Sequence, residues 1–387
     1  MVDLSVELAG LHLRNPLILG AGPPGSSGEL LKKMARGGAG AVVTKSIGVV
    51  PQKYVPRPRM FKIGNSLIST DPWSEKHYKE WFEKEIKIAK EGGVPIIASL
   101  QSMSEDPKED LEVLIPAAEE AGVDAIELSA FGSSPNTFKG IGIGPIQSPD
   151  RTKEVVKAAK KLTGLPVIAK FIPEIWNFLD LIKAAEDGGA DAIALRDTVC
   201  PAIRYNIETG MPIVNRVKSK WLAELSGPAI LAVSLGYVTE AYRNTKLPII
   251  GLGGVSNWES AVEMILAGAT CVGICTAAII YGPGIFKKIT EGMEKYMEKK
   301  GYQTIQEFKG LGVRMLEREW SREEVLPLVS SVDVDTCTGC GICLKGCLYD
   351  AIRIENGKAI VDKEKCVGCG VCVSVCPVKA IKLVEKK

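Results

Sequence analysis

Cysteine spacing constrains the fold of this chain more than any other feature of the sequence. Eight of the eleven cysteines lie between residues 337 and 376, in two runs that both read C-x2-C-x2-C-x3-C. The other three, Cys200, Cys271 and Cys275, are scattered through the preceding sequence. The first residues lack the basic stretch and apolar core of a secretion signal, so we expect a cytoplasmic protein. In that compartment, crowded cysteines indicate metal ligands rather than disulfides.

Both runs have the spacing of bacterial two-cluster ferredoxins, where three cysteines of one run and the fourth of the other hold each 4Fe–4S cluster. By this rule, one cluster is expected on Cys337, Cys340, Cys343 and Cys376. The second is expected on Cys366, Cys369, Cys372 and Cys347. A pair of zinc sites is the alternative, but zinc sites normally use separated C-x2-C pairs. We therefore predict a small α+β two-cluster ferredoxin-like domain over residues 332–387, which would carry electrons.

The first 300 residues alternate short apolar runs with longer amphipathic stretches. Eight runs are predicted as strands, over residues 16–20, 41–44, 95–100, 125–129, 166–170, 192–196, 248–251 and 271–274. Helical periodicity is found in stretches that include 108–121, 151–162, 175–187 and 259–267. Strands that are apolar on both faces suit a covered parallel sheet. The pattern predicts an α/β fold, a TIM (β/α)8 barrel over residues 1–300, followed by a helical connector over 301–331.

Composition excludes several classes of protein. Hydrophobic residues make up 46% of the 387 residues, and 48 Lys and Arg stand against 46 Asp and Glu. This balance supplies a large core and no basic surface for nucleic acid. No apolar run approaches the roughly 20 residues that span a bilayer. We expect neither nucleic-acid nor membrane binding.

Two kinds of segment indicate where a barrel of this type would hold a ligand. Stretches 48–74 and 200–227 are long, and each follows a predicted strand, at the face where barrel enzymes keep their chemistry. Glycines at 251–254 follow the seventh strand, and residues 271–276 form the eighth strand and its end. Such turns hold phosphate groups in many barrels, and a plain structural turn is the alternative.

Several short motifs occur in a fixed order along the barrel. They are Asn15-Pro-Leu-Ile-Leu-Gly-Ala-Gly22, Val43-Thr-Lys-Ser46, Asn65-Ser-Leu, Ser133-Ser-Pro-Asn136, Val167-Ile-Ala-Lys170, Leu225-Ser-Gly-Pro228 and Gly251-Leu-Gly-Gly254. Together they resemble the FMN-dependent dihydroorotate dehydrogenases and the flavin domain of dihydropyrimidine dehydrogenases. A ferredoxin-like tail on such a barrel resembles the dihydropyrimidine dehydrogenases in particular.

The resemblance implies an FMN site. The backbone at Ala21 and Gly22 would approach the flavin ring, with Lys45 near the flavin and Lys170 near its N1/C2=O edge. A cation there stabilises the negative charge of reduced flavin. The residues implied to hold the phosphate are Gly227, Gly253, Gly254, Cys275 and Thr276. For either lysine, an ordinary ion pair is the alternative.

The resemblance also implies a catalytic base and a substrate site. Ser134 is the candidate base for removing a substrate proton, and a loop-capping hydroxyl is the alternative. Substrate contacts are implied for Asn65, Asn136, Asp197 and Thr198. Two positions depart from the family, because Ser129 and Asp197 stand where Asn is usual. An ionised Asp can only accept hydrogen bonds, so the donors available to a pyrimidine differ here.

These observations predict an iron–sulfur flavoprotein that exchanges hydride between FMN and a dihydropyrimidine-type substrate at a CH–CH bond. Electrons would pass through two 4Fe–4S clusters, and an NAD(P)H-oxidoreductase flavoprotein subunit or a ferredoxin would be the partner, because no second nucleotide-binding motif is evident. We expect an oligomer. Dihydroorotate oxidation is the alternative, as is an electron-transfer subunit without its own substrate. A third possibility is a barrel that binds a phosphorylated metabolite and no flavin.

Overall fold

Eight parallel strands close into a barrel, in their order along the chain. They are β3 (Leu17–Leu19), β4 (Ala41–Val43), β7 (Ile96–Leu100), β8 (Ala125–Phe131), β9 (Val167–Phe171), β10 (Ala192–Leu195), β13 (Ile249–Gly251) and β14 (Cys271–Ile274). Pairing of β14 with β3 closes the ring. Each strand coincides with a predicted run, so the predicted (β/α)8 barrel is confirmed.

This computed structural model describes residues 2–53, 57–102, 104, 106–131, 148–171, 177–196, 198–214 and 222–386. The chain divides into two compact units, Met1–Leu316 and Glu317–Lys387. The predicted connector holds the 3-10 turn η5 (Ile305–Glu307) and helix α11 (Leu311–Trp320), and the division falls within α11. None of the described helices is both long and apolar enough to cross a membrane.

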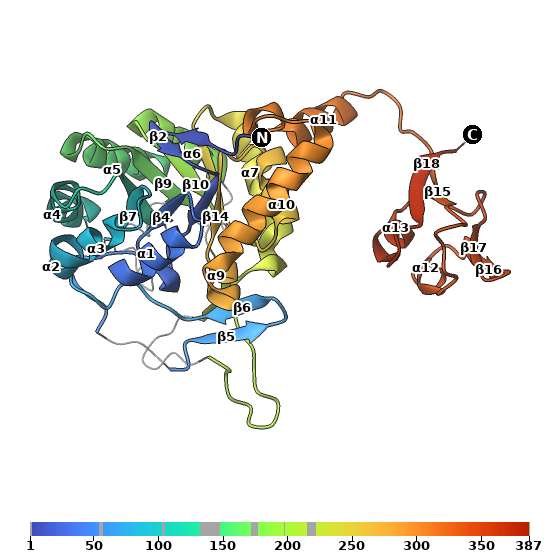
Figure 1. Cartoon of the computed structure of the whole chain (residues 1–387), viewed down its shortest axis with the longest axis horizontal. Helices are drawn as coiled ribbons and strands as arrows, with labels where there is room; N and C mark the ends of the chain where they lie inside the picture. The colour runs from blue at the N-terminus through green and yellow to red at the C-terminus, as the bar shows by residue number, and fades with distance from the viewer. Residues whose placement is uncertain are drawn as a thin grey trace. The chain divides into compact units, whose positions relative to one another are not determined.

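Helices cover the outside of the barrel (Figure 1). They are α1 (Gly28–Arg36), α2 (Tyr78–Glu80), the π-helical turn η2 (Trp81–Glu85), α3 (Ile86–Lys90), α4 (Pro107–Glu120), α5 (Pro149–Leu162), α6 (Phe178–Gly188), α7 (Leu231–Asn244), α8 (Trp258–Leu266), α9 (Thr276–Tyr281) and α10 (Gly284–Lys300). Helix α4 shows why they form. Asp106 caps its first turn by accepting from Lys108 N, and the buried residues Leu111, Leu114, Ile115 and Ala118 follow the helical repeat.

A four-stranded antiparallel sheet joins two distant connections at one end of the barrel. Strands β5 (Met60–Ile63) and β6 (Ser66–Ser69) follow β4, whereas β11 (Val199–Ala202) and β12 (Ala223–Ser226) follow β10. Pairing of β6 with β12 makes the order β11-β12-β6-β5. Figure 1 shows β5 and β6 at the end opposite β2 (Leu11–Leu13), which pairs with β1 (Val6–Leu8). The two long predicted loops therefore build one structure at the carboxyl ends of the barrel strands.

The second unit contains two antiparallel strand pairs and two short helices. Strand β15 (Leu328–Val332) pairs with β18 (Ile381–Glu385), and β16 (Ile352–Glu355) pairs with β17 (Lys358–Val361). Helices α12 (Ile342–Lys345) and α13 (Val371–Val375) each carry the third cysteine of one run. Gly339 and Gly368, both at φ 68°, lie so close to the carbonyls of Gly357 and Leu328 that a Cβ would clash. Each cysteine run can therefore fold tightly only with glycine there.

Candidate functional site

A hollow opens at the carboxyl ends of β3, β9, β10, β13 and β14. Together with the open solvent at its mouth, it holds about 460 Å³ of empty space. The predicted site residues that line it are Ala21, Lys170, Thr198, Gly227, Gly253, Gly254, Cys275 and Thr276. Of the described residues that were predicted in the cofactor or substrate site, Gly22, Lys45 and Asn65 do not line it.

The glycines of this hollow are required by the backbone around them. Gly253 and Gly254 follow β13 with φ values of 93° and 100°, which other residues rarely adopt. A Cβ on Gly254 would lie 2.6 Å from Leu231 Cα at the start of α7, and one on Gly253 would clash with Ser234 Oγ. The turn therefore packs directly against the first turn of a 14-residue helix. Glycine backbone beside a helix start is a favourable environment for an anion.

Cys275 closes the hollow on the β3 side. Gly20 N donates to Ile274 O at 3.0 Å, which joins the end of β3 to the end of β14. A Cβ on Gly22 would lie 2.6 Å from Cys275 Sγ. Gly22 therefore lies directly against the Cys275 side chain, next to the lining residue Ala21.

Two cations line the hollow, and only one of them was predicted. Lys170 is the last residue but one of β9, and its Nζ lies 3.7 Å from Glu127 Oε1 on β8, with both side chains buried. Arg196, which follows β10, is 3% exposed, and its guanidinium carbon lies 5.4 Å from the centre of the Tyr237 ring on α7. The signal that pointed to Lys170, a cation at the end of an apolar strand, applies equally to Arg196.

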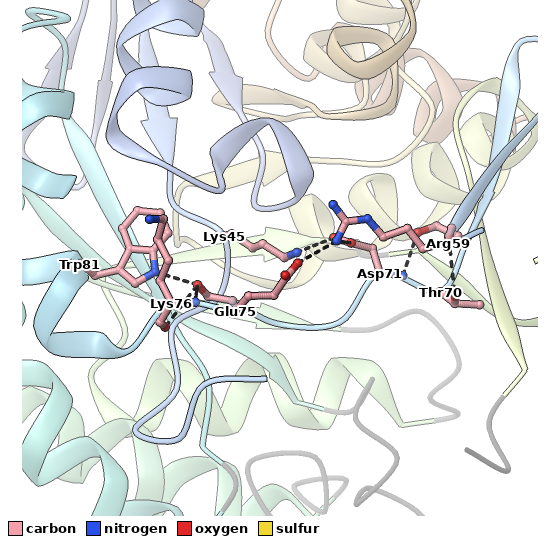
Figure 2. Close-up of polar contacts among 9 residues, drawn as sticks. Lys45, Arg59, Thr70, Asp71, Glu75, Lys76 and Trp81 are labelled. Atoms are coloured by element: carbon pink, nitrogen blue, oxygen red, sulfur yellow. Dashed lines mark hydrogen bonds and ion pairs between the residues drawn. The ribbon is translucent and has the colours of Figure 1, made fainter. Parts of the chain in front are cut away.

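Lys45 takes part in a buried ion-pair network beside the hollow (Figure 2). Its Nζ lies 2.8 Å from Asp71 Oδ2, and each side chain is 5% exposed. Arg59 Nη1 lies 3.2 Å from Asp71 Oδ1 and 2.8 Å from Glu75 Oε1. Lys45 therefore forms the ion pair that was the alternative to a contact with the flavin.

Three serines meet at the ends of β4, β7 and β8. Ser46 Oγ lies 2.9 Å from Ser129 Oγ and 3.1 Å from Ser99 Oγ. Ser129, at the position where the resemblance implies Asn, thus has a hydroxyl neighbour in the barrel. Thr198, another predicted substrate residue, donates its hydroxyl to Glu224 Oε2 at 2.8 Å.

Asn65, another predicted substrate residue, does not line this hollow. Asn65 is exposed in the turn between β5 and β6. Ser134, Asn136 and Asp197 lie outside the described residues. The assignments of these four residues stay predictions.

In the second unit, the first predicted set of cluster ligands surrounds one hollow. Cys337, Cys340, Cys343 and Cys376 line it together with apolar side chains such as Ile354 and Ile381, and its empty space, open solvent included, is about 310 Å³. The fold thus brings three cysteines of one run together with the fourth of the other. Among the described residues, no three His, Cys, Asp or Glu side chains form a site for a single metal ion. A four-iron cluster is wider than one ion, so its ligands must surround a space rather than a point.

Hydrogen-bond donors reach the sulfur atoms of both predicted sets. Ala351 N donates to Cys347 Sγ and Ala380 N to Cys376 Sγ, each at 3.3 Å. Ser330 on β15 contacts two ligands of the second set, with its N 3.4 Å from Cys366 Sγ and its Oγ 3.0 Å from Cys372 Sγ. Ser330 was not predicted from the sequence, because it precedes Cys366 and Cys372 by more than 30 residues.

Backbone N–H groups favour the thiolate form of Cys337 and Cys366, whereas burial raises the pKa of Cys343. Backbone N–H groups of Ala359 and Gly339 lower the pKa of Cys337. Burial opposes ionisation of Cys366, but the N–H groups of Ser330 and Gly368 outweigh it and lower the pKa of that thiol. Thiolates are the form that binds iron, and N–H···S bonds also tune cluster potentials.

Comparisons with known proteins match both units. Residues 3–297 match the dihydroorotate dehydrogenase family, and residues 330–383 match a 4Fe–4S dicluster domain. The catalytic subunit of dihydroorotate dehydrogenase B (NAD(+)) from Thermoplasma volcanium is 37% identical over 314 residues, which cover 81% of this chain and 100% of that relative. The subunit of the same name from Methanothermobacter thermautotrophicus is 35% identical over 308 residues, 80% of this chain and 98% of the relative. The one from Pyrococcus abyssi is 35% identical over 322 residues, 81% and 100%.

Proposed function

Because this chain belongs to the dihydroorotate dehydrogenase family and carries a 4Fe–4S dicluster domain, we propose that it is an FMN-dependent oxidoreductase that acts on the CH–CH bond of dihydroorotate. The observation that carries the proposal is the hollow where Lys170, Arg196 and the glycines after β13 meet. The relatives favour dihydroorotate, the alternative of the sequence analysis, over its first choice of a simpler dihydropyrimidine.

The residues that line the hollow are suited to FMN. Gly227, Gly253 and Gly254 would hold the phosphate group through their backbone, beside the start of α7 and with Cys275 and Thr276 on the opposite wall. The backbone at Ala21, supported by Gly22, would lie against the ring. FMN, when bound, would accept a hydride from the substrate and release the two electrons one at a time.

Two buried cations give this site its electrostatic character. Lys170 and Arg196 both line the hollow, so they would attract an anionic group and stabilise negative charge that develops there. Glu127 and the Tyr237 ring hold them in place from the protein side. Ser134 is the residue that we propose to remove the substrate proton, and Asn65, Asn136, Asp197 and Thr198 are the proposed substrate contacts.

The dicluster domain would conduct electrons away from or toward the barrel. We propose two 4Fe–4S clusters, on the ligand sets described above. The relatives are named catalytic subunits, a name that implies a further subunit, so we propose an NAD(P)H-oxidoreductase flavoprotein subunit or a ferredoxin as redox partner. We also propose that the protein is oligomeric and cytoplasmic.

A visible spectrum of protein purified without oxygen tests the proposal. Flavin bands are expected above a broad iron–sulfur absorbance, and dihydroorotate should bleach the flavin bands. A spectrum without flavin bands, or flavin bands that dihydroorotate leaves unchanged, would overturn it.

A dihydropyrimidine such as dihydrouracil is the second candidate substrate. The observation that favours it is the contact of Ser129 with Ser46, at a position where the family has Asn. Bleaching by dihydrouracil and not by dihydroorotate in the same experiment would establish this second function.

A further inference from the structure

We propose that Asp71 is a positioning residue for the cofactor site. Its carboxylate holds the ammonium group of Lys45 at the carboxyl end of the barrel and offsets the positive charge of that group. This inference rests on the proposed function, because its consequence is the reduction potential of FMN. It assigns a role to a residue outside the barrel wall and outside every motif named above.

The contact between Lys45 and Asp71 is short and buried. Lys45 directly follows Thr44 at the end of β4, and its Nζ lies 2.8 Å from Asp71 Oδ2. Both side chains are 5% exposed, so water screens the two charges little. A buried charge needs a partner, and Asp71 supplies it for Lys45.

The backbone around Asp71 fixes its carboxylate in this place. Asp71 N donates to Ser69 Oγ at 3.1 Å, and Thr70 N donates to Arg59 O at 2.8 Å. The Arg59 side chain returns to Asp71 from the other side, with Nη1 3.2 Å from Oδ1. Charges therefore alternate from the barrel outward, from Lys45 through Asp71 and Arg59 to the half-exposed Glu75 (Figure 2).

Backbone hydrogen bonds connect Lys45 to the hollow. Lys45 N donates to Gly25 O, and Gly25 N donates to Gly22 O, each at 2.9 Å. Gly22 follows Ala21, which lines the hollow. Lys45 thus stands between the turn that would support the flavin ring and the loop that carries Asp71.

This arrangement makes the field at the flavin depend on Asp71. With the carboxylate present, Lys45 contributes a pair of opposite charges, whose fields largely cancel at a distance. Without it, the positive charge of Lys45 is uncompensated, which favours the reduced and more negative flavin. A purely structural loop contact would change stability but would not change the flavin potential in a direction set by charge.

The test is the midpoint potential of the flavin in the full-length holoprotein, titrated without oxygen against a reference dye. Asp71→Asn should shift the potential to more positive values, and Asp71→Glu should return it toward the wild-type value. Arg59→Gln should shift it to more negative values, because the Asp71 charge then loses its second cation. Glu75→Gln is the matched control at the outer, exposed end of the network, and it should leave the potential unchanged.

Equal potentials in wild type and Asp71→Asn, or shifts of the same sign in Asp71→Asn and Arg59→Gln, would overturn the inference while the proposed function stands. A wild-type protein that binds no flavin would overturn the proposed function and this inference with it. If Asp71→Asn does not fold, the flavin potentials of Arg59→Gln and Glu75→Gln test the inference, and equal potentials in these two variants would overturn it. Arg59 is partly exposed, and its replacement leaves the Lys45–Asp71 pair intact.

Discussion

Lys170 on β9 and Glu127 on β8 form an ion pair inside the barrel, with 3.7 Å between Nζ and Oε1 and exposures of only 4% and 2%. The two strands are parallel neighbours, so their pairing brings the two side chains together. Lys170 also lines the hollow that we propose for FMN. Lys170 therefore balances the buried charge of Glu127 in the barrel and also supplies positive charge to the proposed FMN site.

Replacing Glu127 with Gln should destabilise the barrel. The change leaves the Lys170 charge buried without its carboxylate, which costs about 3 kcal/mol in the free energy of unfolding. Urea titration followed by far-UV circular dichroism measures it. Asp187→Gln is the control, because Asp187 pairs with Lys153 and Lys183 at the surface and its loss should cost much less than the loss of Glu127. Equal losses in the two variants would contradict the prediction.

Replacing Arg196 with Gln should weaken FMN binding. Loss of one buried cation from the hollow should raise the dissociation constant about tenfold, which equals about 1.4 kcal/mol. Quenching of FMN fluorescence by flavin-free protein measures it. Arg243→Gln, which removes a surface cation from the same helix as Tyr237, should bind FMN as the wild type does. An unchanged constant in Arg196→Gln would show that Arg196 does not contact the cofactor.

Replacing Gly254 with Ala should impair both folding and flavin binding. The residue has a φ of 100°, and its Cβ would lie 2.6 Å from backbone at Leu231, so we expect a loss of about 2 kcal/mol and little bound flavin. Gly210→Ala is a matched control, with a φ of 68° and open space around the Cβ. Backbone strain alone should cost it about 1 kcal/mol, and its flavin content should be normal. Full flavin occupancy in Gly254→Ala would contradict the assignment of this turn.

Replacing Cys376 with Ser should remove one cluster and spare the other. Cys376 lines the hollow of the first cysteine run, so its loss should reduce iron and acid-labile sulfide to about half. Cys347→Ser should remove the other cluster, and the two variants should differ in the electron paramagnetic resonance of the reduced protein. Cys200→Ser should keep the full iron content, because Cys200 belongs to neither run. Unchanged iron in Cys376→Ser would refute the assignment of Cys376 as a cluster ligand.

Replacing Ser330 with Ala should make the second cluster harder to reduce. The buried hydroxyl lies 3.0 Å from Cys372 Sγ, and hydrogen bonds to ligand sulfur stabilise the reduced, more negative cluster. The midpoint potential should therefore shift to more negative values, with no loss of iron. Ser374→Ala, whose hydroxyl donates to Val371 O on the surface, is the control. A shift of equal size in both variants would exclude a specific role for Ser330.

The barrel could be predicted from the sequence because its signals are local. Each strand is an apolar run bounded by glycine or polar residues, as in 41–44 and 271–274, and each run coincides with β4 or β14 in the structure. The helices with clear periodicity, such as α4 and α8, begin and end within one or two residues of their predicted bounds. The family motifs also indicated residues that line the hollow, including Lys170 and Gly254.

Local signals also identify the cysteines of the second unit, since their spacing is set by the geometry of the backbone around each run. They do not identify Ser330, because it reaches Cys372 only through the pairing of β15 with β18 and the fold of the run against it.

By itself, the sequence determined the number and order of the barrel strands, the two cysteine runs and most of the glycines of the hollow. Only the tertiary structure decided that Lys45 pairs with Asp71 and that Arg196 lines the same hollow as Lys170. It also decided that β6 pairs with β12, which lies more than 150 residues further along the chain. Periodicity and motif spacing depend on neighbouring residues, which the sequence displays directly. The charge partner of a buried side chain depends on which distant segments the closed barrel brings to the same end.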